Sequence, residues 1–192
     1  MNSAATTSLS DGLVTIRPIS MDDVNDTYVA WLRDPMVNQY LETRHTDQTL
    51  ATVGEFVRGI LADSSQHLFA ICLMPEGQHV GRHVGNIKVG PIKQPHRLAD
   101  VSLFIGDRDA WGKGVATAAI RLISRFAIET LGLRKLNAGV YAPNTGSAKA
   151  FLRAGYTQEG VRRRHYLMGS EMVDALEFGL CAEDIDLKRQ TA

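Results

Sequence analysis

A glycine-rich turn offers the clearest chemistry in the sequence, and it stands between an expected strand and the longest expected helix. It reads Arg108-Asp109-Ala110-Trp111-Gly112-Lys113-Gly114-Val115-Ala116. Glycines on both sides of the lysine let a bound group approach the main chain closely. The first amides of a helix lack partners within the helix, and the helix dipole favours negative charge there. The turn therefore predicts a pyrophosphate site, although taken alone it could simply be a tight turn into a helix.

Two other phosphate-binding motifs do not fit this turn. A Walker loop has four residues between its first glycine and the Gly-Lys pair, whereas five separate Gly106 from Gly112, and Gly114 rather than Ser or Thr follows the lysine. A dinucleotide fingerprint needs a third glycine, and Thr117 stands in its place. A nucleotide-dependent enzyme would therefore lack its usual phosphate motif.

A second segment with defined spacing lies about thirty residues downstream, at Asn144-Thr145-Gly146-Ser147-Ala148-Lys149-Ala150-Phe151-Leu152-Arg153-Ala154-Gly155-Tyr156-Thr157-Gln158-Glu159-Gly160. The turn resembles the [Gln/Arg]-x-x-Gly-x-[Gly/Ala] acetyl-CoA signature of the GNAT superfamily of N-acyltransferases. The downstream segment resembles the Asn-x-x-Ser and Gly-[Phe/Tyr]-x-x-Glu-Gly pattern of its ribosomal-protein N-terminal acetyltransferases and related small-amine and amino-sugar acetyltransferases. The resemblance covers roughly residues 13–180, and residues 31–35 and 84–87 also look like this branch.

The resemblance implies roles for individual residues. The amides of residues 112–116 would cradle the pyrophosphate, and the strand at 101–105 would hydrogen-bond the pantetheine arm and face the thioester. Ser147 would lie near the sulfur and could protonate the departing thiolate as a general acid. The residues assigned to acetyl-CoA in this way are Phe104, Ile105, Arg108, Trp111, Gly112, Lys113, Gly114, Val115, Ala116, Asn144 and Ser147.

Two positions depart from the family pattern. Asp109 replaces the first Gln or Arg of the cofactor signature, and Arg108 beside it is the expected substitute. Phe151 stands where many members have a tyrosine whose hydroxyl is the acid. Since phenylalanine cannot donate a proton, the role passes to Ser147 or to a water.

An attacking amine must lose a proton before it can attack a thioester, so a base is expected. Asp100 begins the strand that would border the thioester, where the superfamily often has an acidic base; a strand-end carboxylate exposed to solvent is an equal alternative. Glu42 could hold the ammonium of the substrate or act as the base, and Arg44 could hold a carboxylate or phosphate; the slightly favoured alternative is a solvated pair of loop residues. His165 is a further candidate substrate ligand, with a structural role as its alternative. In some relatives an acidic base occupies the position of Tyr166.

The Arg162-Arg163-Arg164 run could attract an acidic acceptor, but consecutive strand residues alternate between faces, which favours a solvated edge. His79 and His83 are four residues apart but lie at a predicted hairpin with its turn at 75–78, not on a helix, so their spacing does not favour a metal site. We expect no metal, and the implied reaction needs none.

The elements that must position these residues alternate along the chain. Strands are expected near residues 13–17, 67–74, 80–89, 99–105 and 135–141, followed by a hairpin over 156–181 that turns at 168–170. Helices are expected from Ser20 towards Leu32, over 49–61, over 112–130 and from Asn144 to Gly155, because caps and apolar spacing mark them. This order predicts an α/β (α+β) GNAT fold: a mixed, mostly antiparallel twisted sheet of about seven strands with about four helices on both faces.

Length and composition fit one globular domain. The chain has 192 residues, with 21 Lys+Arg and 21 Asp+Glu, so nothing predicts binding to nucleic acid or membrane. Cys72 and Cys181 lie in apolar runs, which suggests buried thiols in a reducing cytoplasm. We expect tails at 1–12 and 183–192 and one N-acetyltransferase domain at 13–182. A homodimer through an exposed strand edge is possible.

Two functions from different classes are compatible with the sequence. The favoured one is an N-acetyltransferase that moves the acetyl group of acetyl-CoA directly to a primary amine, either a small amine such as an amino sugar or a protein N-terminus. The alternative is a non-catalytic acyl-CoA sensor or structural family member, which Asp109 and Phe151 keep open. The sequence does not identify the acceptor.

Overall fold

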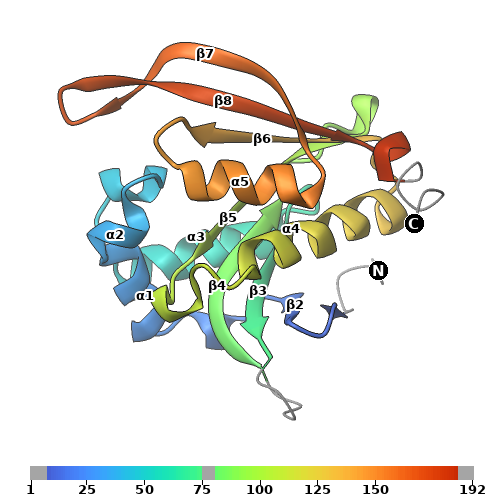
Figure 1. The fold of residues 1–192 in the computed structure, drawn as a ribbon. Coiled ribbons are helices and arrows are strands. Elements are labelled where there is room, and N and C mark those ends of the chain that lie inside the picture. The colour runs from blue at the N-terminus through green and yellow to red at the C-terminus, as the bar shows by residue number, and fades with distance from the viewer. Residues whose placement is uncertain (1–7, 75–80, 186–192) are drawn as a thin grey trace.

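The computed structural model describes residues 8–74 and 81–185, which form one eight-stranded sheet in the order β1-β2-β3-β4-β5-β6-β8-β7 (Figure 1). The strands are β1 (Leu9–Ser10), β2 (Val14–Pro18), β3 (His67–Leu73), β4 (Arg82–Val89), β5 (Leu98–Ile105), β6 (Lys135–Tyr141), β7 (Thr157–Met168) and β8 (Glu171–Cys181). The helices are α1 (Asp26–Arg33), α2 (Pro35–Asn38), α3 (Leu50–Ala62), α4 (Val115–Arg125), which continues as a π-helical turn (Phe126–Thr130), and α5 (Thr145–Ala154).

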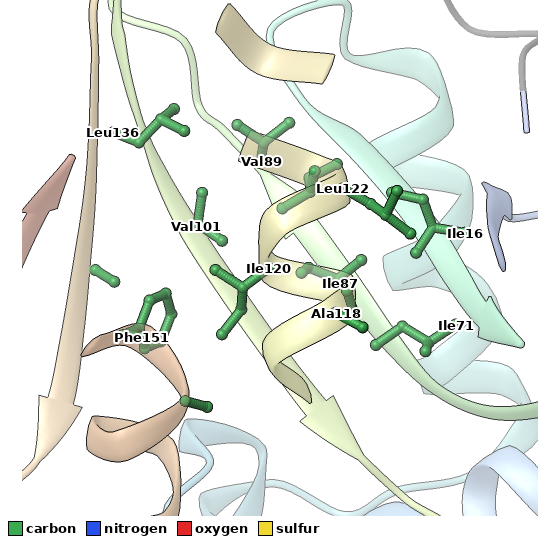
Figure 2. Close-up of a cluster of buried hydrophobic side chains, with 14 of the residues drawn as sticks. Ile16, Ile71, Ile87, Val89, Val101, Ala118, Ile120, Leu122, Leu136 and Phe151 are labelled. Atoms are coloured by element: carbon green, nitrogen blue, oxygen red, sulfur yellow. The ribbon is translucent and has the colours of Figure 1, made fainter. Parts of the chain in front are cut away.

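Helices cover both faces of the sheet. On one face α4 and α5 pack on alternate strand residues, because side chains along a strand point to opposite faces. Figure 2 shows this core with the labelled residues Ile16, Ile71, Ile87, Val89, Val101, Ala118, Ile120, Leu122, Leu136 and Phe151. On the other face α1 and α3 bury a second cluster, which consists of Ile19, Tyr28, Val29, Leu32, Val53, Val57, Ile60 and Leu68. The predicted α/β architecture is confirmed.

The sheet divides between β5 and β6. These strands are parallel, and they pair only at Leu98↔Lys135, Ala99↔Leu136 and Asp100↔Asn137. Beyond this point β5 continues along β4 to Ile105, while β6 continues along β8 to Tyr141. The second half of β5 therefore has no strand on its β6 side among the described residues, so main-chain groups there lack a strand partner.

The structure corrects several expectations. Eight strands replace about seven because Leu9–Ser10, expected in the N-terminal tail, pair with β2. Ile185, which was expected in the C-terminal tail, also packs against the core of α4 and α5. The turn predicted after Met74 lies outside the described residues. β7 forms one edge of the sheet, and the homodimer remains a prediction.

Five α-helices are found in the described part of the chain, where about four were expected. Ser20 does not cap a long helix: it starts a short 3-10 turn (Met21–Asp23), and Asn25 caps α1 instead by accepting from the amide of Tyr28. α1 ends at Arg33, and Pro35 begins a separate helix, α2. Pro35 occupies the first turn of α2, where a missing amide hydrogen costs nothing, and the Asp34 side chain caps this helix.

Candidate active site

A pocket of about 480 Å³ opens where β5 and β6 diverge. Its walls come from α2 and the residues after it, the end of β5, the start of α4 and the first turns of α5. The lining residues are Met36, Val37, Gln39, Tyr40, Leu41, Leu103, Phe104, Ile105, Ala110, Trp111, Gly112, Gly114, Val115, Ala116, Thr117, Asn144, Gly146, Ser147, Lys149, Ala150 and Arg153. Most of the residues predicted to bind acetyl-CoA are therefore brought together here.

The glycine-rich turn presents its main chain to this pocket. Gly112 and Gly114 have φ angles of 72° and 81°, in the left-handed region that glycine adopts without strain. Gly114 begins α4 and offers no side-chain cap, so the first amides of the helix remain available. A Cβ added at Gly112 would meet nothing within 4 Å, which shows open space on that side. This arrangement suits a pyrophosphate.

The turn is held in place by the residues around it. The Nε1 atom of Trp111 donates to the carbonyl of Ile105 at 2.9 Å. Gly106 packs so closely on α1 that an added Cβ would clash with the Trp31 ring. The cofactor turn is thus anchored both to β5 and to α1.

Two residues predicted to bind acetyl-CoA do not line the pocket. The Nη1 atom of Arg108 lies 3.6 Å from Oδ2 of Asp34, the residue that caps α2. Lys113 is exposed to solvent, as is Asp109, so the acidic residue in the signature does not face the pocket. The expected substitution of Asp109 by Arg108 is not seen in the geometry.

Two cations that sequence reasoning missed occupy the pocket wall instead. Lys149 and Arg153 stand four residues apart on α5, so they share one face of the helix, and both line the pocket with Ser147. The signal was present in the sequence, because these positions follow Asn144 and Gly146 at helical spacing.

Ser147 lies at the first turn of α5, opposite the end of β5. The Oδ1 atom of Asn144 accepts from the Ser147 amide at 3.1 Å and caps the helix. Phe151, one turn further, is buried at 2% exposure and packs on Tyr156 and Phe178 with ring centroids 5.0 and 6.0 Å away. A tyrosine at position 151 would therefore point into the core rather than the pocket.

A cluster of polar and aromatic groups lies at the open end of β6, next to Tyr40 and Leu41 of the pocket. The hydroxyl of Tyr141 donates to Oε1 of Glu42, and Nη2 of Arg44 donates to the same hydroxyl at 2.8 Å. Burial raises the pKa of Tyr141, and the hydrogen bond to Glu42 raises it further. The phenol is therefore un-ionised at neutral pH. Sequence reasoning identified Glu42 and Arg44 but not Tyr141.

Aromatic rings surround this cluster. Tyr166 stacks on Tyr141 with centroids 3.8 Å apart and planes at 11°, and the Tyr40 ring lies 5.9 Å from Tyr141. His165 is exposed and contacts the Tyr166 ring edge-on at 4.7 Å, so it stands at the outside of the cluster. Tyr166, at the position of an acidic base in some relatives, serves here as an aromatic wall.

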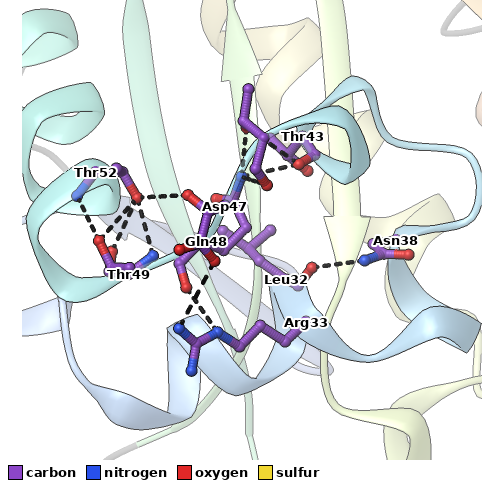
Figure 3. A network of polar contacts seen from close by, with 9 residues as sticks. Leu32, Arg33, Asn38, Thr43, Asp47, Gln48, Thr49 and Thr52 are labelled. Carbon is purple, nitrogen blue, oxygen red and sulfur yellow. Dashed lines mark hydrogen bonds and ion pairs between the residues drawn. The ribbon is translucent and has the colours of Figure 1, made fainter.

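A polar network fixes the segment that carries Glu42 and Arg44, the 3-10 turn Glu42–His45 (Figure 3). The buried amide of Gln48 donates to the carbonyl of Thr43 at 2.8 Å, and Nε of Arg33 donates to the carbonyl of Gln48 at 2.7 Å. These hydrogen bonds tie the turn to α1 and so hold Glu42 and Arg44 in place beside Tyr141.

Asp100 is not among the pocket-lining residues. It occupies the last position of β5 that pairs with β6, three residues before the first lining residue of that strand. Its charge acts on Lys88, whose pKa is lowered by burial and raised in part by Asp100. Its role as a base stays a prediction. His79 lies outside the described residues, whereas His83 contacts Oδ1 of Asn86 through Nε2 at 3.0 Å.

Comparison with known families identifies this arrangement. The model of the acetyltransferase (GNAT) domain matches residues 14–157. The chain belongs to the GNAT acetyltransferase family. The GNAT chain is 25% identical over 181 residues to the uncharacterised N-acetyltransferase p20 of Bacillus licheniformis, covering 93% of this chain and 95% of that protein. It is also 38% identical over 65 residues to the probable N-acetyltransferase YjcK of Bacillus subtilis strain 168, covering 32% of this chain and 36% of that protein.

Solved structures share the fold of the GNAT chain. Mycobacterium smegmatis RimJ in complex with CoA-disulfide superposes with a TM-score of 0.80 at 19% identity, over 96% of this chain and 92% of that one. Vibrio cholerae spermidine N-acetyltransferase in complex with CoA and spermine gives a TM-score of 0.78 at 15% identity, over 91% of this chain and 98% of that one.

Within the described residues, no helix is both long and apolar enough to cross a membrane.

Proposed function

We propose that this GNAT chain transfers the acetyl group of acetyl-CoA directly to a primary amine, with both substrates bound at once. The observation that carries the proposal is the pocket between the diverging β5 and β6, with α4 amides on one wall and Ser147 on another. Gly112, Gly114 and the first amides of α4 would hold the pyrophosphate, and Lys149 and Arg153 would add positive charge beside the phosphates. The free edge of β5 would hydrogen-bond the pantetheine arm.

The proposed chemistry needs no covalent enzyme intermediate. The acceptor ammonium first gives a proton to a base, for which Glu42 is the candidate with the best-defined geometry. The neutral nitrogen then attacks the thioester carbon, and a β5 amide stabilises the negative charge that develops on the oxygen. As the carbon–sulfur bond breaks, Ser147 donates its proton to the thiolate. The new amide nitrogen loses its extra proton through water to Ser147, and Glu42 releases the proton that it took from the ammonium to solvent.

The acceptor would be a small amine, such as an amino sugar, or a protein N-terminus. The structural neighbours include a RimJ protein and a spermidine N-acetyltransferase. These neighbours support an amine acceptor of some kind, and they do not agree on its size and charge.

A free-thiol release assay tests this proposal. Acetyl-CoA is offered with amino sugars, nucleotide-linked amino sugars, polyamines, amino acids and lysine-free N-terminal peptides, and the acetylated product is identified by mass. Turnover on one class supports the proposal. Tight binding of acetyl-CoA with no turnover on any member would favour a non-catalytic acyl-CoA-binding protein, and no binding at all would overturn the proposal.

A further inference from the structure

One hydroxyl group joins a carboxylate to a guanidinium at the open end of β6. Arg44 can only donate hydrogen bonds, so the Tyr141 oxygen must accept from its Nη2 atom and use its single hydrogen for Glu42. Arg44 is itself held by the carbonyl of Leu41 at 3.0 Å and lies 5.0 Å from the centre of the Tyr141 ring. The donor and the acceptor of each hydrogen bond from Arg44 through Tyr141 to Glu42 are therefore determined.

This arrangement leaves half of the Glu42 carboxylate available. Tyr141 occupies Oε1, and Oε2 has no hydrogen-bond partner among the residues that the structure describes. Glu42 is exposed, yet its backbone belongs to the rigid turn held by Gln48 and Arg33. An exposed carboxylate that is fixed in this way can receive a ligand cation without first being ordered.

The surroundings of Glu42 suit an ammonium group. The ring centroids of Tyr40 and Tyr141 lie 5.9 Å apart, and Tyr166 extends this aromatic surface by stacking on Tyr141. Aromatic faces attract cations, and an adjacent carboxylate adds a charge-assisted hydrogen bond. Tyr40 also lines the pocket, so an amine bound here would lie next to the place proposed for the thioester.

The charges around the cluster limit the acceptor to one cationic centre. Arg44 stands one hydroxyl away from Glu42 and balances its charge. The nearby Glu177 already pairs with Arg162, at 3.0 Å between Oε1 and Nε. Oδ1 of Asp174 accepts from the amide of Arg164 at 2.8 Å. A second ammonium close to Glu42 would therefore meet the positive charge of Arg44.

We propose that Glu42, oriented by Tyr141, is the receptor for the ammonium of a monoamine acceptor, and that Arg44 disfavours acceptors with a second cationic centre. Tyr141 is a positioning residue that acts through Glu42. The inference rests on the proposed acetyl transfer and adds the acceptor class.

The test is a double-mutant cycle on Glu42→Gln and Tyr141→Phe, measured with the monoamine of highest kcat/KM in the thiol release panel. Loss of one hydrogen bond to a charged group weakens binding by about tenfold or more. Tyr141→Phe should therefore raise the KM for the amine about tenfold and leave the KM for acetyl-CoA within about twofold. In the Glu42→Gln background, Tyr141→Phe should have less than about a twofold effect, because residues that act as a unit are not additive.

Tyr156→Phe is the matched control. It removes the same atom, a hydroxyl that lies 2.9 Å from Ser124 in the core, and it should lower the Tm without changing either KM. The positioning role of Tyr141 would be overturned if Tyr141→Phe raised the KM for the amine by the same factor in the wild type and in the Glu42→Gln background. The same holds if Tyr141→Phe, with its Tm and turnover retained, leaves the KM for the amine unchanged.

Spermidine tests the acceptor class. We expect its kcat/KM to be at least about tenfold below that of the best monoamine, and Arg44→Gln to narrow this gap, since a charge of the same sign then disappears. Spermidine as the best acceptor of the wild type would overturn the inference while supporting acetyl transfer. Absence of any turnover by the wild type would instead overturn the proposed function.

Discussion

The side chain of Asn144 accepts a hydrogen bond from the main-chain amide of Ser147 at 3.1 Å and so begins α5. This cap directs the first turn of α5 into the pocket, where both residues line the wall. The same bond therefore forms the helix and fixes the place of the proposed acid. The spacing of these two residues in the sequence follows from the geometry of a helix cap.

Ser147→Ala should lower kcat about 100-fold and leave the KM for acetyl-CoA within a few-fold, because general acid catalysis contributes on the order of 10²–10⁴. The measurement is steady-state thiol release. Ser170→Ala, in the β7–β8 turn, is the control and should behave like the wild type. An unchanged kcat in Ser147→Ala would assign the proton to water.

Phe151→Tyr should destabilise the fold and should not supply an acid. Its hydroxyl would enter the core beside Tyr156 and Phe178, and a buried hydroxyl without a partner costs about 1–3 kcal/mol. Thermal unfolding measures the loss. The decisive comparison is Ser147→Ala with and without Phe151→Tyr: restored turnover in the double variant would mean that position 151 does reach the pocket.

Gly114→Ala should weaken acetyl-CoA binding and cost about 1–2 kcal/mol, because its φ of 81° is unfavourable for a residue with a Cβ. Isothermal titration with CoA measures the change in affinity, and thermal unfolding measures the change in stability. Gly59→Ala is the matched control. Gly59 lies exposed within α3 with nothing within 4 Å of an added Cβ, so alanine should stabilise the fold by about 0.5–1 kcal/mol. Equal stability effects in both variants would contradict the role of the turn.

Lys149→Ala and Arg153→Ala should each raise the KM for acetyl-CoA about threefold, with a smaller effect at high salt, as expected for partly exposed charges. Arg108→Ala should change this KM by less than about twofold, because Arg108 faces Asp34 outside the pocket. The comparison tests whether Arg108, as the sequence predicted, or the two α5 residues, as the structure indicates, bind acetyl-CoA. A larger effect at Arg108 than at the two α5 residues would restore the sequence prediction.

Asp23 should make the stability depend on pH in the acid range. Burial opposes its ionisation, but hydrogen bonds from Arg17 and from the Ser20 amide outweigh burial and lower its pKa below 3.8. A lowered folded-state pKa means that the stabilisation is complete above about pH 4 and is lost as the pH falls through the folded-state value. Asp23→Asn should therefore cost about 2 kcal/mol at pH 7 and progressively less below pH 4.

Unfolding curves between pH 7 and pH 2.5 measure this difference. Asp22→Asn is the control, since Asp22 is exposed in the same turn and should change stability only slightly. A constant gap between the wild type and Asp23→Asn over the whole range would contradict the assignment.

Local chemistry explains why much of the fold could be predicted. Thr49 caps α3 and Asn144 caps α5, and Gly155 ends α5 in the left-handed region, as their types suggest. The prediction was wrong at Ser20, which starts a short 3-10 turn rather than a continuous helix. Asp23 is used there for an ion pair with Arg17 rather than for a longer helix. That choice depends on β2, which the local sequence does not specify.

The sequence by itself determined the glycine turn before α4 and the cap of α5, because each depends on the conformation of a few neighbouring residues. Only the tertiary structure decided that Arg108 turns to Asp34 while Lys149 and Arg153 face the pocket. It also decided that Tyr141 meets Glu42, 99 residues away. Such encounters depend on strand register and on the divergence of β5 and β6, and these are set by the packing of the whole sheet.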